Sequence, residues 1–280
     1  MSNILQRLIT GFFFVVILVG GMIAHPLSYV ALFTLITVLG LIEFYRLIER
    51  SQWDIQPQII QGVIAGVVLF LTNTYAAVYH SLSMLALNML TLGVIFISEL
   101  YRKKNNPFGN IAFTLLGVAY VALPFAVTNY FVITGGSASG LANIHFYPWI
   151  LFSCFMIIWA NDSWAYLSGR WFGKHKLFER ISPGKTWEGS AGGAVVALLF
   201  SWIMSMFFKE IDLVHWFATG AILIVTSTLG DLVESMLKRS LGVKDSGTML
   251  PGHGGILDRF DGMFISLPVI WAYFTLFAQG

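Results

Sequence analysis

Charged residues are scarce in this 280-residue chain: Lys, Arg, Asp and Glu make up 11% of it, whereas hydrophobic residues make up 57%. About a quarter of the residues of an ordinary soluble domain are charged. So few charges cannot cover a water-facing surface of this size, which excludes a soluble globular protein, an extended disordered chain and an ordinary nucleic-acid binder. The single cysteine, Cys154, excludes an internal disulfide framework and a cysteine-rich zinc site.

Six long stretches contain no Lys, Arg, Asp or Glu: 8–42, 55–98, 105–161, 189–208, 213–230 and 262–280. A membrane-spanning helix needs about 20 mainly apolar residues, so the first three stretches can each hold two spans and the last three one each. We therefore expect an all-α, polytopic integral membrane protein with about nine transmembrane helices. The expected spans are 9–24, 28–47, 59–79, 82–100, 111–134, 147–168, 188–208, 214–234 and 256–278.

Turn-forming residues divide the three longest stretches. They are His25-Pro26, His80-Ser81 and the Gly- and Ser-rich segment 135–140. The first span has the length of a secretory signal, but it lacks a convincing small-residue cleavage site followed by a soluble chain. Because eight more spans follow, we expect it to be retained.

The basic residues test this topology independently. With nine spans, fifteen of the sixteen Lys and Arg residues fall on the side of the N-terminus, and Lys209 is the exception. By the positive-inside rule, the N-terminus and the charged loops are cytoplasmic, and the C-terminus lies on the opposite side. The compact length and the absence of a transit segment favour a bacterial cytoplasmic membrane.

The charges are also uneven along the chain. Residues 1–161 hold 10 charged residues, whereas 162–261 hold 20. We interpret 1–161 as a hydrophobic transmembrane scaffold of about six spans, the sixth running to about 168. Residues 162–280 are interpreted as a catalytic transmembrane region with cytoplasmic loops and no separate soluble domain.

Four acids lie in or beside the expected spans of the second region: Asp162, Asp231, Asp258 and Asp261. An ionised carboxylate in hydrocarbon costs at least about 2.5–3.5 kcal/mol on insertion scales. Asp258 and Asp261 are three residues apart, hence on one helix face, and a divalent cation would offset their mutual repulsion. Asp231, followed by Glu234 and Ser235, could supply a third ligand. The alternative is that these acids simply reach interfacial water at the ends of spans.

Between these acids we expect a cationic, glycine-rich loop, which contains Lys238-Arg239, Lys244-Asp245 and Pro251-Gly252-His253-Gly254-Gly255. Glycines expose backbone N–H groups, and Lys and Arg bring charge for phosphate oxygens. The alternative is a loop whose positive charge only sets topology. Two roles are possible for His253: it either donates to phosphate or acts as a general acid, or it is an ordinary loop histidine.

The segment 182–189 places Lys185 and hydroxyl groups just before the span that begins near Glu188. Its Pro and Ser/Thr residues suit the start of a helix, so a capping role alone is the alternative to phosphate binding. The segment is not a Walker A loop, because the required glycine and lysine spacing is missing.

From 235 to 261 the sequence resembles the signature of the phosphatidate cytidylyltransferases, also called CDP-diacylglycerol synthases. The segment 182–189 and the Gly230-Asp231 step resemble this family too, whereas the earlier spans match only in hydrophobicity, number and length. The sequence matches the family signature at each of its fixed positions. These positions are Ser235, Lys238, Arg239, Lys244, Asp245, His253, Gly254, Gly255, Asp258, Arg259 and Asp261.

The resemblance implies an enzyme that converts CTP and phosphatidate to CDP-diacylglycerol and pyrophosphate at a lipid bilayer. It implies Mg²⁺ held by Asp231, Asp258 and Asp261. Whether a second, monovalent cation such as K⁺ is also bound is left open. Lys244 and His253 are expected to join these acids as catalytic groups, and no nucleic-acid partner is expected. Whether the protein forms a homodimer is left open. The expected substrate-binding residues are Lys185, Ser235, Lys238, Arg239, Asp245, Gly254, Gly255 and Arg259.

The residues fit such a reaction, because joining two polyanions requires metal ions and basic side chains more than a strong base. One rival is a secondary transporter that uses Asp162 and Asp231, but the basic glycine loop and the lack of internal repeats disfavour it. The other is a different membrane lipid phosphotransferase or a polyprenol kinase. The clustered-Asp pattern of CDP-alcohol phosphotransferases is not found.

Overall fold

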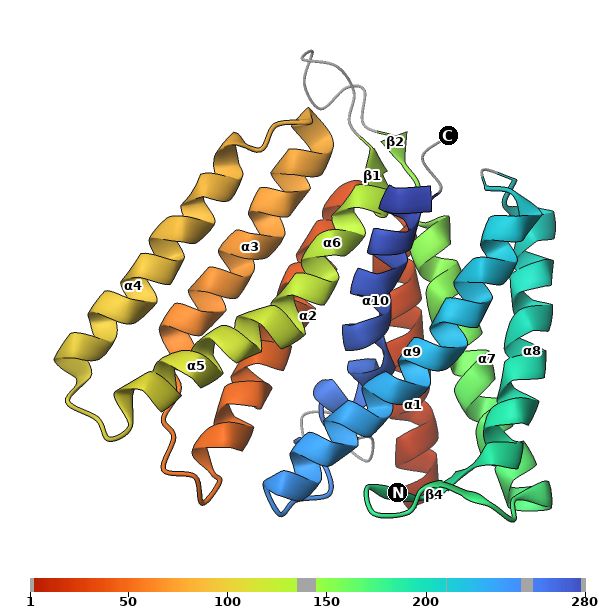
Figure 1. The fold of residues 1–280 in the computed structure, drawn as a ribbon. Helices are drawn as coiled ribbons and strands as arrows, with labels where there is room; N and C mark the ends of the chain where they lie inside the picture. Colours follow the sequence, from red (N-terminus) through yellow and green to blue (C-terminus); the bar gives the residue numbers. More distant parts are fainter. Residues whose placement is uncertain (1–2, 135–144, 210, 248–253, 278–280) are drawn as a thin grey trace. The chain divides into compact units, whose positions relative to one another are not determined.

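The computed structural model describes residues 3–134, 145–209, 211–247 and 254–277. They are mainly helical, with two short β-hairpins (Figure 1). Eight helical segments in this described part are long and apolar enough to cross a membrane, and the apolar part of α1, Ile9–Ile23, is shorter. The predicted all-α, polytopic architecture is confirmed.

The elements in chain order are α1 (Asn3–Ile23), α2 (Pro26–Glu49), α3 (Ile59–Tyr79), the 3₁₀ turn η1 (Ser83–Ala86), α4 (Leu87–Arg102), α5 (Pro107–Gly117), the π-helical turn η2 (Val118–Ala122), α6 (Leu123–Val132), β1 (Ile133–Thr134), β2 (His145–Phe146), α7 (Trp149–Phe172), β3 (Lys176–Phe178), β4 (Ser182–Thr186), α8 (Trp187–Phe207), α9 (Leu213–Ser240) and α10 (Leu257–Phe277). Strand β1 pairs with β2, and β3 with β4, both antiparallel.

The predicted turns separate helices as expected. The His25 side chain accepts a hydrogen bond from the Leu27 N–H (3.1 Å) and caps α2, whose first residue is Pro26. His80 ends α3 in the left-handed conformation. The predicted break at 135–140 lies outside the described residues. Helix α9 runs six residues beyond the predicted end at 234.

The chain forms two compact units. Unit 1 contains 1–148 and 240–260, and unit 2 contains 149–239 and 261–280. The assignment of 1–161 as a scaffold and of 162–280 as the catalytic region stays a prediction.

Aromatic side chains fill the core of unit 1. The rings of Tyr29 and Phe33 lie 4.9 Å apart, Phe33 contacts Phe125 at 5.6 Å, and Phe125 contacts Phe260 at 5.3 Å. All four are fully buried, and such pairs contribute beyond their buried area. The first residues of α10 are therefore packed against the aromatic core that α2 and α6 build.

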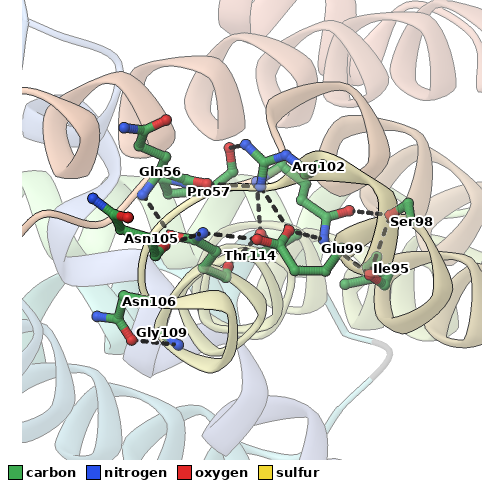
Figure 2. Close-up of polar contacts among 12 residues, drawn as sticks. Gln56, Pro57, Ile95, Ser98, Glu99, Arg102, Asn105, Asn106, Gly109 and Thr114 are labelled. Carbon is green, nitrogen blue, oxygen red and sulfur yellow. Dashed lines mark hydrogen bonds and ion pairs between the residues drawn. The ribbon is translucent and has the colours of Figure 1, made fainter.

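A polar network at the ends of α4 and α5 fixes the 50–58 connection in unit 1 (Figure 2). The Glu99 carboxylate accepts hydrogen bonds from Gln58 (2.7 Å), Arg102 (2.7 Å) and Asn110 (2.7 Å). Arg102 also donates to the Gln56 carbonyl (2.9 Å). Because buried polar groups are stabilising only when their partners are in place, this network holds one geometry.

Small residues bring α7 and α8 together in unit 2. A side chain on Gly189 would come within 2.6 Å of the Ala165 carbonyl, and one on Gly193 within 2.6 Å of the Asn161 carbonyl. This spacing of small residues four apart is typical of close helix packing in membranes. It places Asn161 and its neighbours against the start of α8.

The hairpin of β3 and β4 leads directly into α8. The Thr186 hydroxyl accepts a hydrogen bond from the Gly189 N–H (3.1 Å) and caps α8, while phosphate binding by this segment stays a prediction. Glu188 in the first turn accepts the backbone N–H groups of Lys174 (3.1 Å) and His175 (3.2 Å). These contacts hold the residues just before β3, the strand that pairs with the Lys185-bearing strand β4.

Candidate functional site

A polar pocket of about 350 Å³ lies in unit 2, among α7, β4, α8 and α9. Small-molecule sites commonly measure about 300–1,000 Å³. Polar side chains are expensive within the depth of a membrane and usually line functional cavities there. Its lining contains three residues singled out from the sequence, Asp162, Lys185 and Asp231. The others are Asn161, Ala165, Tyr166, Ser182, Gly184, Thr186, Ser190 and Thr228.

An ion pair between Lys185 and Asp231 lies at the pocket. The Lys185 Nζ is 2.6 Å from the Asp231 Oδ2, and it donates a longer hydrogen bond to the Thr228 carbonyl (3.4 Å). The Ser235 hydroxyl donates to the Asp231 Oδ1 (3.2 Å). The hairpin thus brings a cation from β4 to the carboxylate of α9, and a hydroxyl one turn along α9 orients the same carboxylate.

A second ion pair lies within α9. Glu234, which is fully buried, is 2.5 Å from the Nζ of Lys238, four residues later. Such i, i+4 pairs stabilise helices, and basic residues suit a helix C-terminus. The prediction that Lys238 and Arg239 belong to a loop was therefore wrong: both lie in the last turn of α9.

Two further acids of unit 2 have no direct ion pair with a described residue: Asp162 in α7 and Asp261 in α10. Asp261 is close enough to Asp231, Glu234 and Asp162 for these carboxylates to repel it electrostatically. Tight packing contributes to this closeness, because a side chain on Gly230 would come within 2.7 Å of the Asp261 carbonyl.

The chemistry of this set of acids fits a divalent cation. Asp261 interacts electrostatically with Asp162, Asp231 and Glu234, Asp162 also interacts with Asp231, and ammonium groups pair directly with Asp231 and Glu234. Oxygen ligands and surplus negative charge suit Mg²⁺. In the described part of the chain, however, no three Asp, Glu, His or Cys side chains are arranged closely enough to hold an ion. The predicted metal site stays a prediction.

Asp258, the third predicted metal ligand, belongs to unit 1 and lies in the first turn of α10. Its carboxylate accepts hydrogen bonds from the N–H groups of Gly255 (2.8 Å) and Ser246 (3.1 Å). Gly254 has φ +81°, and a side chain there would meet the Asp258 Oδ2 at 2.6 Å. Glycine is therefore required at 254 both for its backbone conformation and for the close approach of this carboxylate.

Sequence reasoning missed one acid of unit 1, Glu43 of α2. It is 4% exposed, and its carboxylate accepts hydrogen bonds from the backbone N–H groups of Ile256 (2.9 Å) and Leu257 (3.0 Å). A signal was present, because Glu43 falls inside the predicted span 28–47. Its partners, more than 200 residues later, could not be read from the pattern.

The remaining predicted residues have varied surroundings. Lys244, Asp245 and Arg259 are exposed in unit 1, and Arg239 is exposed at the end of α9. Gly255 is buried. His253 lies outside the described residues. The structure thus brings Lys185, Asp231 and Ser235 together in one unit and Gly254, Gly255 and Asp258 together in the other.

Comparison with known proteins places these residues in a family. Residues 5–277 match the cytidylyltransferase family. The chain belongs to this family. The match covers nearly the whole chain, including both the pocket of unit 2 and the loop around Asp258.

Curated bacterial relatives carry the name phosphatidate cytidylyltransferase. The protein of Staphylococcus haemolyticus (strain JCSC1435) is 41% identical over 186 residues, which are 65% of this chain and 66% of the relative. Those of Staphylococcus aureus (strain COL) and Staphylococcus epidermidis (strain ATCC 35984) are each 35% identical, over 265 and 266 residues, and cover 92% of both chains. The resemblance found in the 235–261 signature is confirmed.

Proposed function

We propose that this integral membrane enzyme transfers the cytidylyl group of CTP to phosphatidate, forming CDP-diacylglycerol and releasing pyrophosphate. The observation that carries the proposal is the family match over residues 5–277, within which relatives that cover 92% of the chain are named phosphatidate cytidylyltransferase. The polar pocket of unit 2 supports it, because the ammonium group of Lys185 and the carboxylates of Asp162 and Asp231 line this pocket in an otherwise apolar helical protein.

In the reaction, a phosphate oxygen of phosphatidate attacks the α-phosphorus of CTP. The bond from this phosphorus to the bridging oxygen of the β-phosphate breaks, and that oxygen leaves on pyrophosphate. The second pKa of a phosphate monoester is about 6, so the attacking group is largely dianionic at neutral pH. A strong general base is unnecessary, and the main requirement is to offset repulsion between two polyanions.

The side chains of unit 2 can meet this requirement. Lys185 presents an ammonium group at the pocket for phosphate oxygens, and Thr186 and Ser190 add polar groups beside it. We propose Asp231 and Asp261 as ligands of Mg²⁺ and, from its place in the signature, Asp258 as a further metal ligand; a monovalent cation such as K⁺ is the second proposed ion. When bound, Mg²⁺ supplies charge neutralisation and polarisation of the phosphoryl group.

Roles for the basic residues of the signature follow from their place in it. Lys238, Arg239, Lys244 and His253 are proposed phosphate contacts, and Arg259 and Asp245 are proposed to help hold substrate. Because phosphatidate remains in the leaflet while CTP is dissolved, the active site must be reached from both. We place the enzyme in a bacterial cytoplasmic membrane with its N-terminus and active-site loops cytoplasmic and its C-terminus opposite.

The experiment uses purified protein in detergent with Mg²⁺, labelled CTP and phosphatidate. We expect labelled CDP-diacylglycerol and one pyrophosphate per lipid product, and neither without phosphatidate. Diacylglycerol and a polyprenol serve as alternative acceptors. Product formation with either of them but not with phosphatidate, or pyrophosphate release without a lipid acceptor, would contradict the proposed function.

A further inference from the structure

Glu43 is a buried acid that the proposed reaction does not use. It lies within α2 of unit 1, in a helix whose other buried residues are almost all apolar or aromatic. An ionisable residue inside a membrane-spanning helix is costly and is commonly retained for function. The question is what its carboxylate holds in place.

The carboxylate caps the start of α10 from a different helix. Its Oε2 accepts the N–H of Ile256 (2.9 Å), and its Oε1 accepts the N–H of Leu257 (3.0 Å). The first N–H groups of a helix have no partner within that helix. Glu43 therefore satisfies donors that α10 leaves open, and it does so immediately before Asp258.

Ser246 links the two carboxylates. Its hydroxyl oxygen lies 2.5 Å from the Glu43 Oε1 and 2.9 Å from the Asp258 Oδ2, while its N–H donates to Asp258 (3.1 Å). A hydroxyl has one hydrogen to donate, so the two acids compete for it. A change at Glu43 consequently reaches Asp258 through a single intervening side chain.

Gly247 and Gly255 leave room for the Glu43 carboxylate. A side chain on Gly247 would come within 2.7 Å of the Glu43 Oε2, and one on Gly255 would overlap the Glu43 carboxylate and the Ser246 hydroxyl. The backbone can wrap the carboxylate only without side chains at these positions. Part of the glycine content is thus explained by a buried carboxylate of α2, not by phosphate.

We propose that Glu43 is a positioning residue, which holds Ser246 and the start of α10 so that Asp258 keeps its orientation for the cytidylyl transfer. This inference rests on the proposed function. It deepens that function by assigning a role to a residue of the scaffold region, far in sequence from the family signature.

The test compares Glu43→Gln with wild-type protein. Glutamine has nearly the same size but presents an amide N–H₂ in place of one acceptor oxygen. We expect kcat to fall about 10- to 100-fold, with the KM for CTP changed less than about two-fold. The amide hydrogens of Ile256 and Leu257 should exchange with solvent at least about ten-fold faster. Glu49→Gln, an exposed acid of the same helix, is the matched control and should match wild type in all three measurements.

Several results would overturn the inference: wild-type kcat and exchange in Glu43→Gln, faster exchange with unchanged kcat, or a raised KM alone. If Glu43→Gln does not fold, Ser246→Ala receives the same measurements under the same criteria. If the wild-type protein makes no CDP-diacylglycerol, the proposed function fails. The amide exchange of Ile256 and Leu257 then still decides whether Glu43 holds the start of α10.

Discussion

The acidic side chains of the two units have different interaction partners. In unit 1, Glu43 and Asp258 each accept backbone N–H groups, and Ser246 lies between them. In unit 2, Asp162, Asp231 and Glu234 each repel Asp261 electrostatically, and in the described part of the chain only Asp231 and Glu234 of these four acids pair directly with a lysine. Backbone donors thus hold the carboxylates of Glu43 and Asp258 in one orientation, whereas the acids around Asp261 have fewer cationic partners than carboxylates, which suits a site that binds a cation.

The largest effect is expected from Asp261→Asn, because it removes a carboxylate proposed to hold the metal ion. Formation of CDP-diacylglycerol should fall at least about 100-fold, while the protein elutes as a folded monodisperse peak. Asp212→Asn, which changes an exposed acid of the same unit, is the control and should keep wild-type turnover. Near-wild-type activity of Asp261→Asn would remove Asp261 from the proposed metal site.

Lys185→Met tests the cation of the pocket. The substitution keeps much of the side-chain length but removes the ammonium group that pairs with Asp231 at 2.6 Å. Charge-assisted contacts contribute about 1.5–3 kcal/mol, so kcat/KM for CTP should fall about 10- to 100-fold. Lys176→Met, on the neighbouring strand and exposed, is the control. Equal kcat/KM in both variants would assign Lys185 to topology and capping alone.

A smaller change is expected from Lys244→Ala. Lys244 is exposed in unit 1, and exposed charge pairs contribute about 0.2–1 kcal/mol. The KM for CTP or phosphatidate should therefore rise about two- to five-fold with little change in kcat. Steady-state kinetics with each substrate varied separately will assign the contact, and unchanged kinetics would exclude Lys244 from the site.

The smallest effect on catalysis is expected from Glu99→Gln in the network of Figure 2. Breaking a buried ion pair commonly costs about 3–5 kcal/mol, so the thermal unfolding midpoint should fall clearly. Turnover per folded molecule should stay at the wild-type value, because every partner of Glu99 shown here is structural. A specific loss of kcat with an unchanged midpoint would show that the Glu99 network contributes to catalysis and not to stability alone.

Charge scarcity alone predicted most of the fold. The predicted span 59–79 coincides with α3, and 188–208 differs from α8 by one residue at each end. These positions follow from local rules, because every helix in a membrane needs about 20 apolar residues. The extension of α9 to Ser240 was missed, because the last residues of the helix are charged and give no hydrophobic signal; the Glu234–Lys238 pair lies in this part.

The candidate site was only partly predictable. Asp258 and Asp261 lie on one helix as their spacing indicated, and Lys185 lies just before a capped helix. The pairing of Lys185 with Asp231 joins a β-hairpin to a helix 46 residues away, and Glu43 bonds residues more than 200 positions later. Such contacts depend on tertiary packing, which a one-dimensional pattern of charges does not contain.

The most direct test of the central claim is a structure of the protein with CTP and Mn²⁺, which replaces Mg²⁺ and scatters anomalously. We expect an anomalous peak beside Asp231 and Asp261, with the CTP phosphates in the unit 2 pocket near Lys185. A peak and phosphates located away from these three residues would contradict it.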